Sequence, residues 1–426
     1  MVSFKNGILN IKIGKPNLDT AVDISFFMLM CSLYANRTRV EGENYFYYAS
    51  FFLFLGTTVI KLFARMKSKE SVIIPSFTLW YGGFLLLSVA SMLWAPYPEN
   101  SMLVFSRMVQ STVITFCMAQ NYATRASLMR CVKLYAWSGA YAALYLLIKT
   151  PTSEWFSGGF GASIVYLNSN AVGMIFTLCL LVSFFLAIYC KEKIFFVFSI
   201  LQLFIVVLTS SRKSLLTSVL GIVVFLLMRS NKRTVIWRVL AAMGIVVAVY
   251  FIIMSVPEFY SAIGVRFESM FNHLNDTGGD YSISLRQIFI GHARDMFFEK
   301  PLLGYGINNF IVQIGFRTGV ATYAHNNYYE ILADLGVVGF TVFYGFYFYI
   351  LISLVKIWRN GNSSLVKLMI VWVSVIMICE YGIVSYYTVY IQMTLCMAYL
   401  FLCAHVNTDN YSSGVPSYLK YGNVYD

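Results

Sequence analysis

Continuous apolar runs fill most of the chain, with short polar segments between them. Each run is close to the roughly 20 residues that a transmembrane helix needs, and none alternates as the strands of a β-barrel do. The last two runs are separated only by Ser385–Thr388, so one long helix followed by a broken one is an alternative there. The pattern predicts twelve spans, at about 19–36, 45–63, 71–95, 101–120, 127–149, 168–189, 193–210, 213–229, 236–255, 327–355, 366–385 and 387–405.

The composition agrees with a membrane protein. Hydrophobic residues make up 59% of the chain and charged residues 12%, and the mean hydropathy is +0.69. Soluble domains carry about 25% charged residues. We therefore expect an all-α, polytopic integral membrane protein with one large extracytoplasmic loop that contains helices.

The distribution of basic residues predicts the orientation. With the N-terminus inside, 20 of the 31 Lys and Arg residues fall in cytoplasmic segments, as the positive-inside rule requires. The net charge of +12 is thus explained by membrane topology, and we expect no nucleic-acid partner. Residues 1–255 would form a bundle of nine spans, 256–326 an outward loop, 327–405 three further spans and 406–426 a cytoplasmic tail.

The outward loop is the only long polar interval, and it holds three of the four histidines. Outside it, Arg212 and Lys213 form the turn TSSRKSLL, an outward hairpin without acidic neighbours in the sequence. Arg107 lies about two turns into the fourth span, at a depth where an unpaired guanidinium costs a few kcal/mol. An anion near the outer leaflet would account for both sites.

Within the loop, YSISLRQIFIGHARDMFFEKP predicts an amphipathic helix that Ser282 or Ser284 caps and Pro301 stops. Arg286 would lie in its first turn, where the helix dipole disfavours a cation. This position indicates a partner anion, and a solvated surface arginine is the alternative. The residues expected to be buried are Ile283, Leu285, Ile288, Ile290, Met296 and Phe297.

His325 stands just before the tenth span, in YAHNNYYEILADLGVVGF, where Asn326 or Asn327 would cap the helix. A histidine there can act as a general base near neutral pH, or can simply form a hydrogen bond at the interface. Asn326, Glu330 and Asp334 follow at spacings of four residues and share a helix face.

Two further signals concern acids and metals. Glu380, near the outer end of the eleventh span, is a candidate for a site, or pairs with an arginine such as Arg107. The loop histidines His273, His292 and His325 are 19 and 33 residues apart, which matches no close-set zinc pattern. We expect no metal site and no other cofactor.

Several of these motifs together resemble the O-antigen ligase and polysaccharide polymerase superfamily. They are the SSRKSLL turn, SLRQIF…EKPLLGYGINNF, and HNNYYEILADLGVVGF, with SMLWAPYPENS and LNSNAVG earlier in the chain. The resemblance covers most of the chain, but its specific part runs from Arg212 to Phe340.

The resemblance implies a glycosyltransferase in the bacterial cytoplasmic membrane that uses a glycan on undecaprenyl pyrophosphate at the outer face. Arg212 and Arg286 would hold the pyrophosphate, and His325 would activate the acceptor hydroxyl. We expect direct displacement with inversion, since arginines can stabilise the leaving group. Further candidates for binding the pyrophosphate or the glycan are Lys213, Arg107, Arg317, Asn326, Glu330 and Glu380.

The acceptor separates the alternatives. A polymerase for capsule, exopolysaccharide or O-antigen transfers to another lipid-linked repeat and would work with a flippase and a chain-length regulator. A ligase transfers to lipid A-core of lipopolysaccharide. The HNNYYEILADLG form, the SRKSLL turn and the tyrosine-rich outer segments resemble polymerases more than ligases. A lipid-linked glycan flippase needs charged residues deep in several broken spans, which this chain has few of. An envelope scaffold would leave the outer arginines unexplained.

Overall fold

The computed structural model describes residues 2–5, 8–11, 18–35, 44–69, 72, 74–157, 160–165, 167–228, 235–275, 280–361 and 363–412. These residues are almost entirely helical, as expected. A short antiparallel hairpin, β1 (Val2–Lys5) and β2 (Ile8–Ile11), is an addition that the hydrophobic pattern does not predict. Most of the expected C-terminal tail lies outside the described residues.

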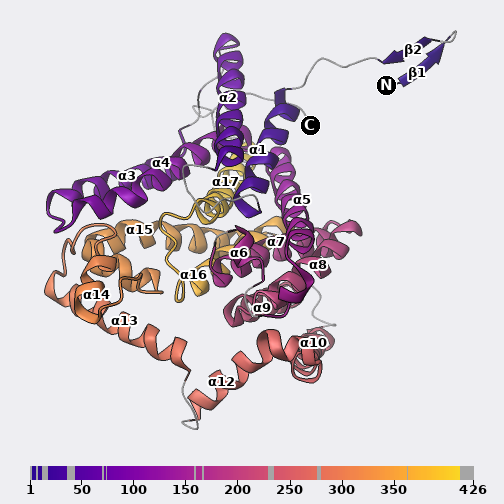
Figure 1. Cartoon of the computed structure of the whole chain (residues 1–426). Helices are drawn as coiled ribbons and strands as arrows, with labels where there is room; N and C mark the ends of the chain where they lie inside the picture. Colours follow the sequence, from indigo (N-terminus) through magenta and orange to yellow (C-terminus); the bar gives the residue numbers. More distant parts are fainter. Residues whose placement is uncertain are drawn as a thin grey trace.

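Each of the twelve expected spans coincides with a helix (Figure 1). The break between the last two is longer than Ser385–Thr388, because one helix ends at Cys379 and the next begins at Val389. The helices are α1 (Leu18–Tyr34), α2 (Tyr45–Lys67), α3 (Ser76–Ala90), α4 (Pro98–Asn121), α5 (Arg125–Lys149), α7 (Ser169–Tyr189), α8 (Ile194–Leu208), α9 (Arg212–Leu227), α10 (Val235–Ser255), α15 (Asn327–Asn360), α16 (Ser364–Cys379) and α17 (Val389–Ser412).

Length and composition make this a multi-pass membrane protein. Within the described ranges, seven helices are long and apolar enough to cross a membrane: α2, α3 with the turn that follows it, α4, α5, α7, α10 and α15. Helices α8, α16 and α17 are shorter apolar helices. Helices α1 and α9 have 17 and 16 residues, somewhat fewer than the roughly 20 that cross a bilayer perpendicularly.

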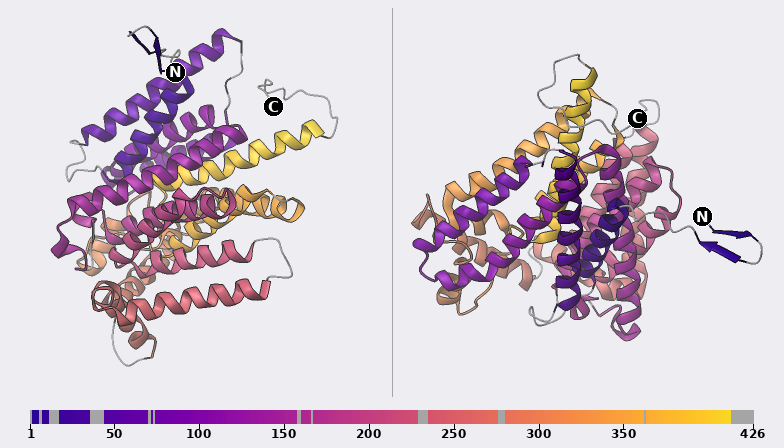
Figure 2. Two further views of the ribbon diagram at one scale, coloured as in Figure 1. Left: turned by 90° about the vertical axis from the view of Figure 1, so that its right-hand side faces the viewer. Right: turned by 90° about the horizontal axis from the view of Figure 1, so that it is seen from above.

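The polar interval folds into short helices between α10 and α15. They gather at one end of the long helices, which run side by side (Figure 2, left); we call this end of the bundle the loop end. The elements are α11 (Pro257–Phe259), the π-helical turn η5 (Tyr260–Gly264), α12 (Val265–Leu274), α13 (Tyr281–Glu299) and α14 (Phe310–Thr318). Three further short elements are η2 (Ser91–Leu93), η3 (Thr152–Glu154) and α6 (Ala162–Val165).

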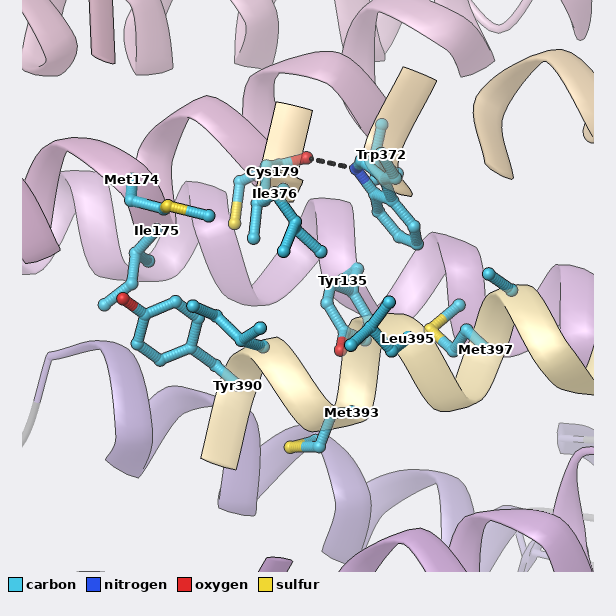
Figure 3. Close-up of a cluster of buried hydrophobic side chains, with 14 of the residues drawn as sticks. Tyr135, Met174, Ile175, Cys179, Trp372, Ile376, Tyr390, Met393, Leu395 and Met397 are labelled. Carbon is cyan, nitrogen blue, oxygen red and sulfur yellow. Dashed lines mark hydrogen bonds between the residues drawn. The ribbon is translucent and has the colours of Figure 1, made fainter. Parts of the chain in front are cut away.

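The main hydrophobic core lies between α5, α7, α16 and α17 (Figure 3). Trp372 and Tyr135 are fully buried there, with ring centroids 5.3 Å apart. The indole N–H of Trp372 donates to the Leu178 carbonyl at 3.1 Å, so its one polar group is satisfied inside the core. Methionines and cysteines fill the space around these rings, as expected for adaptable side chains in an irregular core.

Helix α15 breaks at Gly336, whose φ of 62° and ψ of −163° belong to a region that is essentially restricted to glycine. The chain 301–306 crosses the break in direct backbone contact. The N–H groups of Val337 and Val338 donate to the carbonyls of Pro301 and Leu302, and the Gly306 N–H donates to the Asp334 carbonyl. A Cβ at Gly336 would lie 2.3 Å from the Leu302 oxygen. This crossing fixes the loop to α15.

We predict that Gly336→Ala destabilises the fold by at least the 1–3 kcal/mol typical of a strained backbone position, because the new Cβ also displaces residues 302–303. The matched control is Gly345→Ala on the same helix, where a Cβ meets nothing within 4 Å. Fluorescence-detected gel filtration after heating in detergent measures both. Equal melting temperatures would show that the crossing does not hold the loop.

Candidate active site

Helix α13 begins one residue after an aspartate. The carboxylate of Asp280 accepts a hydrogen bond from the Ile283 N–H at 3.0 Å, so Asp280 is the N-cap. The predicted caps Ser282 and Ser284 were wrong, since both lie inside the first turn. Arg286 is therefore the sixth residue of the helix and lies in its second turn, beyond the strongest effect of the dipole.

The buried face of α13 agrees with the prediction only in part. Met296 is buried as predicted, with Phe289 and Ala293, against α14 and α15, whereas Ile288 is 48% exposed. Apolar residues lie on two sides of α13. Contact with Phe310 on α14 buries the side that carries Phe289, Ala293 and Met296.

Arg212 is held by Asp280. Its guanidinium donates to the Asp280 carboxylate at 2.6 Å and to the Arg266 carbonyl at 2.5 Å. The hairpin has no acidic neighbour in the sequence, and its acidic partner comes from a residue 68 positions later. Burial disfavours the charged form of Asp280, but the hydrogen bonds from Arg212 and Ile283 outweigh it, so the pKa of the carboxyl is lowered.

His325 lies beside α13 and is half-buried between aromatic rings. Its ring centroid is 4.0 Å from that of Tyr323 and 6.3 Å from that of Phe289. The backbone of His325 has a φ of 55°, in the left-handed region, which few side chains adopt without a local constraint. Its Nδ1 atom is buried without a hydrogen-bond partner among the described residues.

Two cations act on His325. Burial, followed by the charges of Arg286 and Lys213, lowers the pKa of His325 from 6.5 to about 4. The imidazole is thus neutral at physiological pH and can accept a proton.

Lys213 donates to the Cys379 carbonyl at 3.2 Å, and its ammonium lies where a side chain at Gly382 would collide with it.

Arg286 has no hydrogen bond or ion pair within the part of the chain that the structure describes, although its side chain is half-buried. Burial, the charge of Arg212 and that of Arg266 lower the pKa of Arg286. Arg212, Arg266 and Arg286 thus lie near one another and near the Asp280 carboxylate, and Lys213 lies near Arg286. This excess of positive charge next to a neutral imidazole is suited to an anion with more than one charge.

The acids at the start of α15 bind backbone. Asn326 caps the helix through the Tyr328 and Tyr329 N–H groups, which decides between the two predicted caps. The Glu330 carboxylate accepts from the Ala324 N–H at 2.6 Å, one residue before His325. The Asp334 carboxylate accepts from the Asn308 and Phe310 N–H groups at 2.7 Å each. Glu330 therefore positions the histidine loop, and Asp334 the 306–310 turn.

Glu380 is fully buried, and hydroxyl groups hold both of its oxygens. Tyr344 and Ser385 donate to it, and Tyr347 donates at 3.1 Å. The expected pairing with Arg107 is not among the ion pairs of the described residues. Arg107 instead stands 5.6 Å from the centroid of the Tyr387 ring.

Arg317 lies on α14, where its guanidinium donates to Glu299 at the end of α13 at 2.6 Å. This hydrogen bond raises the pKa of Arg317 and lowers that of Glu299. The pair joins two loop helices, so the structure gives Arg317 a structural contact.

Among the described residues, no group of three His, Cys, Asp or Glu side chains is arranged to hold a metal ion.

Three residues that contact members of the candidate site were missed by the sequence analysis. They are Asp280, Tyr323 and Asn168. Asn168 caps α7 through the Ala171 N–H, and its amide donates to the Tyr323 hydroxyl at 3.1 Å. Asp280, in the GGDYS sequence ahead of an apolar run, carries a recognisable N-cap signal. The contact between Asn168 and Tyr323 spans 155 residues and leaves no local signal.

Residues 194–344 match the O-antigen ligase family model. The matched segment runs from α8 into α15 and contains Arg212, Lys213, Arg286 and His325. The resemblance that the motifs indicated is therefore confirmed over this segment, and it supports a membrane enzyme of the ligase or polymerase type. A search of curated proteins found no match.

We predict that His325 remains neutral from pH 8 down to about pH 5, because its pKa is about 4. Histidine-selective NMR in detergent, with His325→Gln to assign the signal among the four histidines, measures the titration. A midpoint near 6.5 would contradict the assigned burial and the effect of the two cations.

We also predict that Asp280→Ala lowers the free energy of unfolding more than Asp280→Asn. Alanine removes both the cap and the partner of Arg212, whereas asparagine can still cap α13; loss of a cap costs about 0.5–2 kcal/mol. Thermal unfolding in detergent at neutral pH compares them. Equal stabilities would show that the Asp280 cap contributes little.

Proposed function

We propose that this protein is a polysaccharide polymerase of the bacterial cytoplasmic membrane. It transfers a glycan carried on undecaprenyl pyrophosphate to a sugar hydroxyl of another lipid-linked repeat unit, at the extracytoplasmic face. The family match supports the ligase or polymerase type of function. The observation that carries the chemistry is the juxtaposition of a neutral His325 with the cations Arg286 and Lys213.

In the proposed reaction, the acceptor hydroxyl oxygen attacks the anomeric carbon of the donor sugar. The bond from that carbon to the pyrophosphate oxygen breaks, and its electron pair leaves with the pyrophosphate. His325 accepts the hydroxyl proton. Because bond formation and cleavage occur on opposite sides of the carbon, the anomeric configuration inverts and no covalent intermediate forms.

The cations stabilise the leaving group. Arg286 is already in place without a partner among the described residues, so an incoming phosphate need not displace a carboxylate from it. Arg212 is pinned by Asp280 in a fixed orientation and adds a second guanidinium. Preorganised donors of this kind lower the barrier more than solvated ones. The scheme uses no metal ion, because arginine and lysine supply the positive charge.

The alternative is an O-antigen ligase, which uses the same donor and the same displacement but passes the glycan to lipid A-core. The matching family model is named for that activity. The geometry around His325 serves either acceptor. The HNNYYEILADLG motif, the SRKSLL turn and the tyrosine-rich outer segments resemble polymerases more than ligases, and this resemblance puts the polymerase first.

We predict that Arg212→Ala, Arg286→Ala and His325→Ala each fail to complement a deletion of the gene in its native host, with transfer reduced roughly 100-fold or more. Arg294→Ala is the matched control, since Arg294 lies on α13 but is exposed and contacts only Asp295. Gel analysis of surface glycans, with immunoblots for protein level, gives the result.

The glycans in the deletion strain separate the alternatives. Single repeats on the cell surface or on lipid A-core indicate a polymerase. Long carrier-linked chains with a bare lipid A-core indicate a ligase. A normal glycan ladder with His325→Ala would exclude the assigned site and would favour a transporter, which has no need of a general base.

A further inference from the structure

The chain between α16 and α17 holds the start of α15 in place. We call residues 380–388 the α16–α17 junction. The backbone N–H of Asn327, the first residue of α15, donates to the Glu380 carbonyl at 2.9 Å. The side-chain oxygen of Asn327 accepts from the N–H groups of Ser385 and Tyr386 at 2.9 and 3.3 Å. Because Asn327 is fully buried, these bonds are shielded from water, and the junction fixes the first residue of α15.

The amide of Asn327 also reaches across the break in α15. It donates to the Tyr344 hydroxyl at 2.7 Å, and that hydroxyl donates to the Glu380 carboxylate at 2.8 Å. Asn327 and Tyr344 are 17 residues apart, which corresponds to about 25 Å along a straight helix. The bond therefore forms only because the break at Gly336 turns the two parts of α15 toward each other.

Glu380 is the centre of this network. Its buried carboxylate accepts from the hydroxyls of Tyr344 and Tyr347 on the second part of α15, and from Ser385 in the junction. Its backbone carbonyl meanwhile holds Asn327 on the first part. A buried polar network is rigid when its members are satisfied, and loss of one member leaves the others without a partner. Glu380 thus joins both parts of the broken helix to one point.

The histidine loop is thereby fixed on both sides of His325. Before the histidine, the Ala324 N–H donates to the Glu330 carboxylate at 2.6 Å. After it, the junction encloses Asn327. Between these two points the backbone of His325 has a φ of 55°, a conformation that a residue other than glycine keeps only where the surrounding structure imposes it. The network therefore determines where the imidazole lies.

The same segment also fixes Lys213. The Lys213 ammonium donates to the carbonyl of Cys379 at 3.2 Å, and a Cβ at Gly382 would lie 2.9 Å from its Nζ atom. Residues on both sides of Glu380 thus contact Lys213, while Glu380 itself binds the start of α15. The base and one of the cations of the candidate site are therefore placed by one stretch of chain.

We propose that Glu380 and Asn327 are positioning residues of the transfer reaction, which place His325 relative to Lys213. The assignment rests on the proposed function for the role of His325 as the base. Glu380 then acts through Asn327 and does not contact the glycan. Misplacement of a reacting group by about 1 Å can lower the rate roughly 100-fold, so a network remote from the reacting atoms can control transfer.

The first variant is Asn327→Ala, which removes the bonds of this side chain to the junction and to Tyr344. Asn121→Ala is the matched control. Asn121 is a buried asparagine at the end of α4, and its amide donates to the Thr58 hydroxyl and the Cys117 carbonyl at 2.8 Å each. Both variants remove a buried amide with two partners or more, but only Asn327→Ala changes the surroundings of the histidine loop.

A second pair of variants changes Glu380. In Glu380→Gln, the amide oxygen can still accept from Tyr344, and the hydroxyls of Tyr347 and Ser385 can turn to accept from the amide N–H groups. In Glu380→Leu, a side chain of similar size can do neither. Glutamine should therefore preserve the network and leucine should disrupt it. This pair gives the answer if Asn327→Ala does not fold.

Two measurements on the full-length protein test the proposal. Histidine-selective NMR in detergent follows the titration of His325, and the complementation assay measures transfer per immunoblotted protein. We expect Asn327→Ala and Glu380→Leu to raise the titration midpoint of His325 from about 4 toward 6.5, because the ring moves away from Lys213 and becomes less buried. Transfer should fall about 10-fold or more. Asn121→Ala and Glu380→Gln should keep the wild-type midpoint and most of the transfer.

A wild-type titration of His325 in both Asn327→Ala and Glu380→Leu overturns the proposal, since the network then does not place the histidine. Thermal unfolding in detergent gives the stability of each variant. If Asn327→Ala and Asn121→Ala lose the same melting temperature and the same transfer, the bonds of Asn327 serve the fold alone, and the proposal is again overturned.

His325→Ala separates this proposal from the proposed function. If His325→Ala supports transfer, the catalytic assignment fails, and the titration of His325 in Asn327→Ala and Glu380→Leu alone decides whether the network places the histidine. If His325→Ala abolishes transfer while Asn327→Ala and Glu380→Leu retain it, the positioning role fails although the catalytic assignment stands.

Discussion

The site depends on a contact between two stretches of backbone. Where α15 breaks at Gly336, carbonyl and N–H groups that a continuous helix would have used are turned toward residues 301–306. Both partners need glycine, since a Cβ at Gly304 would lie 2.4 Å from the Asp334 carbonyl carbon and one at Gly336 would meet Leu302. Because His325 stands just before α15, and α13 ends just before Pro301, this crossing determines where Arg286 lies relative to the histidine.

The cationic cluster shows why such a scaffold is required. The cations Arg212, Arg266 and Arg286, on α9, α12 and α13, repel one another, and the Asp280 carboxylate lies near all three. Such an arrangement costs folding free energy when no anion is bound. The hydrophobic contacts of α13 with α14 and α15, together with the backbone crossing, offset that cost. A bound pyrophosphate would compensate the charges, so the free protein should be less stable than the occupied one.

The sequence was sufficient for the helices, because each needs only a long apolar run. Short polar motifs mark His325, Arg212 and Arg286 as candidate site residues, and their catalytic roles stay predictions. The sequence did not show which residues these side chains contact. The dipole argument that was applied to Arg286 holds for Arg212, which lies at the first position of α9, and its compensating acid is remote in the sequence. The hydroxyl cluster around Glu380 and the contact of Asn168 with Tyr323 likewise arise from tertiary packing. Local patterns locate charged residues, but only the fold decides which of them meet.

The ion pair between Arg212 and Asp280 joins two parts of the site. On one side, backbone hydrogen bonds join the chain after α13 to α15, and α14 packs against both helices. On the other side, α9 carries Arg212 and Lys213. Among the described residues, the Arg212–Asp280 ion pair is the side-chain bridge between α9 and α13. Under the proposed function, a polyprenyl pyrophosphate would place its phosphates against both parts. Under the proposed function, the strength of this ion pair would determine how readily the two parts separate to exchange the glycan.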